Sequence, residues 1–173
     1  MDTGQMPQDI NLRGEICWKY KKSIIYPLPG SNLIKRVEEN FEIEFPKDFI
    51  DFISKSNGSI PITRFFEFKS NRYVVDRFLC LLDKPSEHDK GMYDIKVVFS
   101  QLDERILSDG NMTGAELVPI AALFAGDFVC LDYTESKINP VVCIWYNEES
   151  DEYDPVTEKI ADNVNRFLDM LEE

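Results

Sequence analysis

The densest group of side chains that could do chemistry lies near the C-terminus, where residues 147–154 read Asn-Glu-Glu-Ser-Asp-Glu-Tyr-Asp. Carboxylates at such short spacing can bind calcium, transfer protons or attract a cationic partner. An EF-hand calcium loop needs a glycine at its middle and ligands at alternate positions, and this stretch has neither. Paired carboxylates are also too frequent in this chain to indicate acid–base catalysis.

Aromatic side chains interleaved with charge are typical of interface anchors, and Tyr146 and Tyr153 flank or interrupt the acidic stretch. Either of two interpretations places this stretch in an exposed loop, and in one of them the carboxylates form a docking surface for a basic protein partner. The alternative is a solvated loop in which Asp154 caps the following helix. The candidate partner-binding residues are Glu148, Glu149, Asp151 and Glu152.

Other reactive groups are scattered. His88 is the one histidine and lies in the polar stretch 85–91, which predicts a solvated loop. Four dispersed cysteines and one distant histidine lack the ligand spacing of a zinc site. A single glycine at Gly126-Asp127 predicts a tight turn rather than a phosphate loop. We accordingly expect no catalytic residues, no metal and no cofactor, so the sequence does not predict an enzyme.

The composition limits the class of partner. The 173 residues include 19 Lys and Arg against 32 Asp and Glu, for a net charge of −13. This charge opposes direct binding of nucleic acid and of anionic membranes, whereas it attracts basic proteins at long range. The longest apolar runs are far shorter than the roughly 20 residues of a membrane-spanning helix, and the N-terminus does not resemble a secretory signal. A cytoplasmic protein with reduced cysteines is expected.

The elements that must position these groups begin after an N-terminal extension, residues 1–30, which we expect to be partly ordered. A single domain follows over residues 31–173. Leu33, Ile34 and Val37 share one helical face in a first helix, capped by Ser31 or Asn32 and running to about residue 40. A second helix begins with Pro46 and ends at Asn57-Gly58, since both of these residues tolerate the left-handed conformation.

The remainder of the chain is rich in short strand-like runs. Aromatic and β-branched residues predict strands at 63–68, 73–82, 118–124, 128–132 and 141–146. A helix is expected over 94–107. A last helix is expected to begin at Asp154-Pro155, with Ile160, Val164, Phe167, Leu168 and Leu171 on its apolar face. Short links favour antiparallel neighbours, so the predicted class is α+β, with helices packed on one face of a mainly antiparallel sheet.

Two groups of motifs resemble the SUKH superfamily, over about residues 33–171. The family opens with a helix that carries a glutamate, then a Leu-Pro-like pair that begins a second helix, and an Asn-Gly stop. The corresponding residues here are Glu38, Phe45-Pro46, Asp48, Phe49, Phe52 and Asn57-Gly58. Its second signature is a strand, a tight turn with glycine, a strand that ends in aspartate and a strand with an aromatic end. The corresponding stretches here are 118–121, 126–132 and 141–145.

The sequence departs from the family pattern at three places that affect turns and packing: Phe45 replaces leucine, Ser59 replaces a second glycine, and 123–125 is bulkier. The resemblance implies the SUKH fold and a bacterial immunity protein that neutralises a cognate toxin, an antitoxin, by stoichiometric occlusion. Many such toxins are nucleases, which must be basic to hold a polyanion. The alternative is a non-catalytic regulatory or scaffold module that docks cellular proteins, as the eukaryotic members do.

Overall fold

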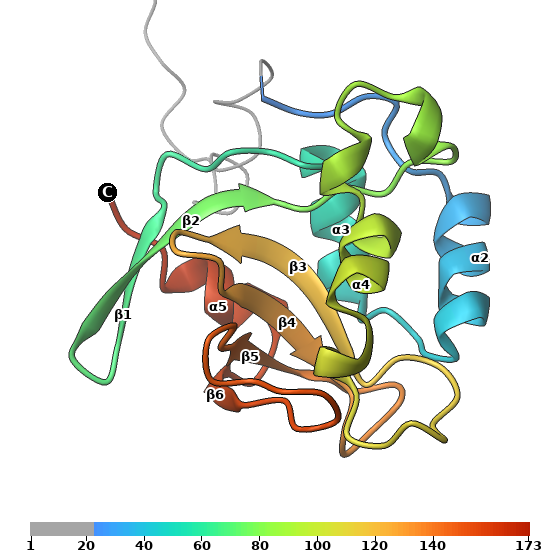
Figure 1. The fold of residues 1–173 in the computed structure, drawn as a ribbon. Helices are drawn as coiled ribbons and strands as arrows, with labels where there is room; N and C mark the ends of the chain where they lie inside the picture. The colour runs from blue at the N-terminus through green and yellow to red at the C-terminus, as the bar shows by residue number, and fades with distance from the viewer. Residues whose placement is uncertain (1–22) are drawn as a thin grey trace, which may run out of the picture.

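The computed structural model describes residues 23–173 (Figure 1). Most of the predicted extension, including Cys17, therefore lies outside the described residues. The helices are α2 (Ser31–Phe41), α3 (Lys47–Ser56), α4 (Ile95–Leu102) and α5 (Val164–Asp169), with 3₁₀ turns η1 (Pro85–Glu87), η2 (Gly91–Tyr93) and η3 (Asp103–Ile106). The strands are β1 (Phe65–Phe68), β2 (Asn71–Phe78), β3 (Leu117–Leu123), β4 (Phe128–Asp132), β5 (Val141–Trp145) and β6 (Thr157–Ala161).

The strands form one antiparallel sheet whose spatial order, β1-β2-β3-β4-β5-β6, is also their order along the chain. Such a meander needs only short connections between neighbours, as the turn residues of the sequence predicted. The predicted α+β class is confirmed. Five of the strands were expected, and β4 has the predicted bounds.

The helices of the first half match the predicted pattern with small shifts at their ends. Gly30 rather than Ser31 or Asn32 is the N-cap of α2, and Pro46 is the N-cap of α3. The expected helix over 94–107 is α4 followed by the tighter turn η3, because Asp103 takes a φ of 46° and interrupts the regular helix. Asp94 caps α4 with its carboxylate, which accepts the N–H of Lys96 at 2.8 Å.

The prediction for the C-terminal region was wrong in one respect. Residues 157–161 form a sixth strand, and the last helix begins only at Val164. This segment pairs with β5: Trp145 lies opposite Thr157, and the N–H of Tyr146 donates to Val156 O at 3.0 Å. The pairing gives hydrogen-bond partners to backbone groups of β5 that would otherwise have none. Asn163, not Asp154, caps the helix, through a 2.9 Å bond from the N–H of Arg166 to its Oδ1.

Alternate residues of the strands point to opposite faces of the sheet. The larger core lies against α3 and α5, where the rings of Phe66, Phe78 and Phe167 meet edge to face. On β4 and β5, Cys130, Cys143 and Trp145 alternate with residues of that core and belong to a smaller cluster with Ile106 and Leu117. The turn η3 thus anchors the second cluster.

The sheet curls so strongly that its two ends approach each other. Lys69, at the turn between β1 and β2, places its Nζ 2.9 Å from Glu158 Oε2 on β6, although β1 and β6 are the outermost strands. The hydroxyls of Tyr73 on β2 and Tyr146 after β5 lie 3.3 Å apart. The β1–β2 hairpin, which extends as an arm in Figure 1, is therefore tied to the opposite edge of the sheet.

The exit from α3 joins three segments of the chain through one buried amide. Asn57 is fully buried, and its Nδ2 donates to the carbonyls of Ile25 at 3.0 Å and Leu81 at 3.2 Å. Its Oδ1 accepts the N–H of Leu81 at 2.8 Å. Gly58 follows in the left-handed region, with φ of 66°, as the sequence predicted for the helix stop.

We expect Gly58→Ala to lower the free energy of unfolding by about 1 kcal/mol or more, and Gly58→Val by more than that. A Cβ at this position would lie 2.5 Å from Ile25 Cδ1 and 3.1 Å from Cys80 Cβ, in addition to the unfavourable φ. Gly30→Ala is the control, since a Cβ there meets nothing within 4 Å and only the cost of alanine at the N-cap of α2 remains. Urea unfolding measures both variants, and equal midpoints would contradict the assignment of Gly58.

The described cysteines, Cys80, Cys130 and Cys143, are free and buried. Cys130 lies opposite Cys143 in the register of β4 and β5. Burial raises the pKa of the Cys80 thiol to about 12, and burial also raises the pKa of Cys130 and of Cys143. The thiolate that reacts with alkylating reagents is therefore scarce at neutral pH.

In a Cys17→Ser variant, we expect iodoacetamide at pH 8 to alkylate the three buried thiols at least about 100-fold more slowly than free glutathione. Labelling becomes complete in urea, because unfolding restores the ordinary thiol pKa. Intact mass measured over time follows the reaction. Fast labelling of the native chain, or a two-proton mass deficit that reductant removes, would refute the prediction.

Candidate functional site

The four predicted partner-binding residues lie together on the connection between β5 and β6, here called the acidic loop (residues 147–154). Glu148, Glu149, Asp151 and Glu152 are all exposed. Within the described part of the chain, none of the four has an ion-pair partner within 4 Å. The structure thus brings these carboxylates to one surface, and none of them forms an ion pair with another described residue.

The acidic loop is internally bonded rather than loose. Ser150 is almost fully buried, and its hydroxyl donates to Tyr146 O at 2.7 Å and accepts the N–H of Val156 at 2.8 Å. Asp151 and Asp154 exchange backbone hydrogen bonds of 3.2 and 3.1 Å. Asp154 therefore closes a turn within the loop and does not cap a helix.

Arg105, on η3, holds the acidic loop from beneath. Its guanidinium donates to Asn147 Oδ1 at 2.8 Å, to the backbone oxygen of Asn147, and to Ser150 O at 2.8 Å. The guanidinium carbon lies 5.2 Å from the centre of the Trp145 ring, and Trp145 Nε1 donates to Arg105 O at 3.0 Å. A planar group with several fixed donors suits this arrangement, which one ammonium group cannot reproduce.

Tyr153 fixes the far side of the acidic loop. The backbone N–H of Tyr153 donates to Glu104 O at 2.9 Å, and Tyr153 adopts a φ of 57°. A hydrogen bond to the Glu104 carboxylate raises the pKa of the Tyr153 hydroxyl to about 12. The ring packs over Gly110, where an added Cβ would come within 3.0 Å of it. Two carboxylates of η3, Asp103 and Glu104, thereby adjoin those of the acidic loop.

The turn between β3 and β4 borders the acidic loop. Asp127 Oδ1 accepts the N–H of Asn147 at 2.9 Å, which ties the two connections together. Ala125 and Gly126 have φ values of 77° and 93°, as a tight turn requires, and this confirms the predicted turn at Gly126-Asp127. Phe124 precedes them with 71% of its surface exposed. An exposed aromatic ring thus lies on a turn bonded to the acidic loop.

His88 does not join this surface. Its ring Nε2 lies 2.7 Å from Tyr26 O, and its Nδ1 accepts the N–H of Lys90 at 3.0 Å, in the connection that contains η1 and η2. Residues 23–173 contain no group of three or more His, Cys, Asp or Glu that could hold a metal ion. None of the helices described in that range is long and apolar enough to cross a membrane.

Sequence reasoning located the carboxylates but missed Arg105. One basic residue between Glu104 and Ile106 gives no periodic signal, and its partners are backbone oxygens about 40 residues away. An isolated arginine inside an acidic run, followed by a buried isoleucine, is the one indication the sequence holds.

Comparison with models of known protein families gives a match over most of the chain. A family model described as SMI1-KNR4 cell-wall (SUKH_6) matches residues 31–168. This span includes every described helix and strand from α2 to β6 and most of α5, as well as the acidic loop. No match was found among curated proteins or among solved structures.

We expect Arg105→Lys to loosen the acidic loop and to lower the free energy of unfolding by roughly 1–3 kcal/mol, since carbonyls of the loop lose charged donors. Amide hydrogen exchange at Ser150 and Asp151 should accelerate markedly. Arg36→Lys is the control, because Arg36 forms an exposed pair with Asp83 that contributes at most about 1 kcal/mol. Unchanged exchange in the Arg105 variant would contradict the assigned role.

Proposed function

Since the chain belongs to the SMI1-KNR4 family of the SUKH superfamily, we propose that it is an immunity protein that binds and neutralises a cognate protein toxin. The single observation that carries the choice of surface is the acidic loop. It presents four exposed carboxylates on a backbone that Arg105, Ser150 and Tyr153 hold in one conformation. A surface ordered before binding loses little conformational entropy on docking.

Charge supports a basic toxin, and a nuclease in particular. A nuclease needs Lys and Arg to hold a polyanion, and an acidic inhibitor can occupy the same cationic surface. With a net charge of −13, the chain also accelerates encounters with such a partner at low ionic strength. The proposed mechanism is therefore stoichiometric occlusion in the cytoplasm, without catalysis by this chain and without a cofactor.

The aromatic groups at the edge of the acidic loop complement this charge. Phe124 and Tyr153 are exposed by 71% and 38%, so each has apolar surface to bury against a partner. Aromatic anchors contribute affinity at the centre of interfaces, whereas rim charges mainly set association rate and specificity. The acidic loop and the hydrogen-bonded turn between β3 and β4 thus supply both the charges and the aromatic anchors of a protein-binding surface.

The word cell-wall in the family description favours a second candidate function, outside toxin systems. A regulatory or scaffold module would use the same surface to dock cellular proteins instead of a toxin. The position of the gene discriminates the two functions, because an immunity gene is expected immediately downstream of the gene for a large secreted toxin.

Affinity capture tests the proposed function directly. The tagged full chain is used to capture partners from the native host, and the captured protein is then expressed with and without the chain. We expect a basic protein, held one to one, that stops growth when expressed alone and is harmless with the chain. Capture of a non-toxic cellular protein would instead support the regulatory module and refute the toxin.

The acidic loop can be tested with that partner by reversing Glu148, Glu149, Asp151 and Glu152 to lysine. We expect association to slow by at least about tenfold at low salt and its salt dependence to flatten, while the melting temperature stays nearly constant. A control variant reverses four exposed carboxylates elsewhere and so changes the net charge equally; these are Glu67, Glu87, Asp89 and Glu173.

Stopped-flow association rates at several salt concentrations compare the two variants. If the acidic loop is the docking surface, only the loop variant loses most of its association rate. If both variants slow equally, the overall charge steers the partner and the acidic loop has no special part in recognition.

A further inference from the structure

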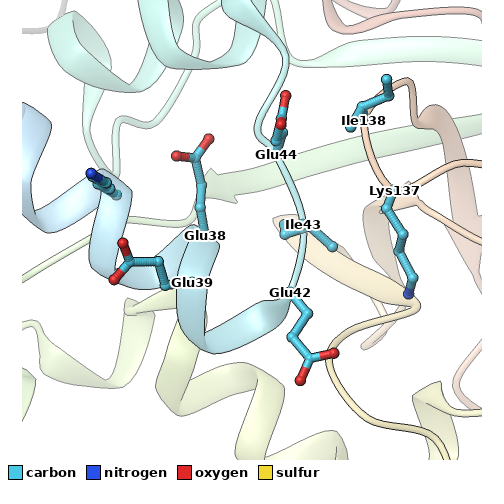
Figure 2. A pocket seen from close by; sticks show the side chains of 8 residues that line it. Glu38, Glu39, Glu42, Ile43, Glu44, Lys137 and Ile138 are labelled. Atoms are coloured by element: carbon cyan, nitrogen blue, oxygen red, sulfur yellow. The ribbon is translucent and has the colours of Figure 1, made fainter.

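A groove of about 450 Å³ lies away from the acidic loop, between the end of α2, the link to α3 and the connection between β4 and β5. Figure 2 shows its lining residues. Ile43 lines the groove with only 5% of its surface exposed, whereas Ile138 lies at its border with 54% exposed and supplies the isoleucine surface that a partner can reach. The other lining residues are Lys35, Glu38, Glu39, Glu42, Glu44 and Lys137.

The walls of the groove are held rigidly by backbone hydrogen bonds. Ile43 N–H donates to Glu38 O at 3.1 Å, and Glu44 N–H donates to Lys137 O at 2.9 Å. Glu44 O accepts the hydroxyl of the buried Tyr133 at 2.9 Å. The link between α2 and α3 is thereby fixed against the opposite wall, and the groove exists before any partner arrives.

The lining charges divide into engaged and available groups. Glu38 Oε1 accepts the N–H of Phe45 at 2.7 Å, and Glu42 Oε2 accepts the Thr113 hydroxyl at 3.0 Å. Lys137 donates its ammonium to Ala115 O at 2.7 Å, and its side chain is directed away from Ile138 in Figure 2. Glu39, Glu44 and Lys35 are exposed and, among the described residues, have no ion-pair partner, so two of the three available charges are negative. Available negative charge therefore borders apolar surface.

We propose that this groove docks an extended segment of a basic protein partner, with one aliphatic side chain against Ile138 and flanking Lys or Arg side chains at Glu39 and Glu44. The proposal deepens the proposed function, on which it rests for the nature of the partner. Charge complementarity selects the occupant: an acidic segment would meet two uncompensated carboxylates, and an uncharged segment would leave them unpaired. A cationic side chain with an aliphatic stem satisfies both the wall and the carboxylates.

The test uses the isotope-labelled full chain and a defined probe, the peptide acetyl-Arg-Leu-Lys-Arg-amide, followed by NMR amide shifts. We expect shifts concentrated at Glu39, Ile43, Glu44 and Ile138, weakened by salt. The peptide with glycine in place of leucine should bind several-fold more weakly, and acetyl-Glu-Leu-Glu-Glu-amide should not bind. Shifts spread evenly over the surface, or largest at the acidic loop, would overturn the assignment of the groove.

A double variant, Glu39→Lys with Glu44→Lys, should weaken binding of the basic peptide by about tenfold or more. Its control is Glu67→Lys with Asp89→Lys, which makes the same change in net charge at two exposed carboxylates elsewhere. Ile138→Ser provides an uncharged second variant at an exposed position and should also weaken binding. Equal weakening by the control pair would contradict the proposal, as would self-association of the chain that the groove variant abolishes.

These experiments distinguish an error in the groove proposal from an error in the proposed function. If the captured partner is a toxin but binds the groove variant with unchanged affinity, the groove proposal is wrong and the immunity function stands. If capture yields no toxin while the peptide maps to the groove and loses binding in the variant, the groove is supported and the toxin is not.

Discussion

The acidic surface of this protein depends on the guanidinium of Arg105. Carboxylates gathered on one connection repel one another, and an unrestrained loop would spread to separate them. Arg105 prevents this by donating to Asn147 and Ser150 from below, while Trp145 covers its face. Its positive charge is turned toward the backbone, so that the exposed carboxylates keep their negative potential toward solvent.

The hydrogen bonds of Arg105 depend on how other parts of the fold are arranged. Arg105 is placed by η3, which packs its neighbour Ile106 into the smaller core under Trp145. The acidic loop can reach Arg105 because β6 pairs with β5 and returns the chain beside it. The sheet curls until Lys69, on the turn between β1 and β2, pairs with Glu158 on β6. The sheet thus serves as the frame for a surface made of connections.

The sequence was sufficient for features that local chemistry determines. Apolar spacing placed α2 and α3, and Asn57-Gly58 marked a helix end because a left-handed φ favours glycine. The sequence was misleading at Asp154-Pro155. These two residues are a good local signal for the start of a helix, but the pairing of β6 with β5 overrides that signal. The carboxylates of the acidic loop were visible as a charged run, but Arg105 and the groove at Ile43 and Ile138 were not. Both depend on contacts between segments far apart in the chain, which no local pattern records.

The most direct measurement is hydrogen–deuterium exchange of the full chain with and without its captured partner. Docking on the preformed acidic surface predicts slower exchange at residues 147–154, and an effect that weakens as salt is raised. The same experiment reports every other surface at once. Protection confined to the β1–β2 hairpin or to residues 23–30, with none at residues 147–154, would contradict the account.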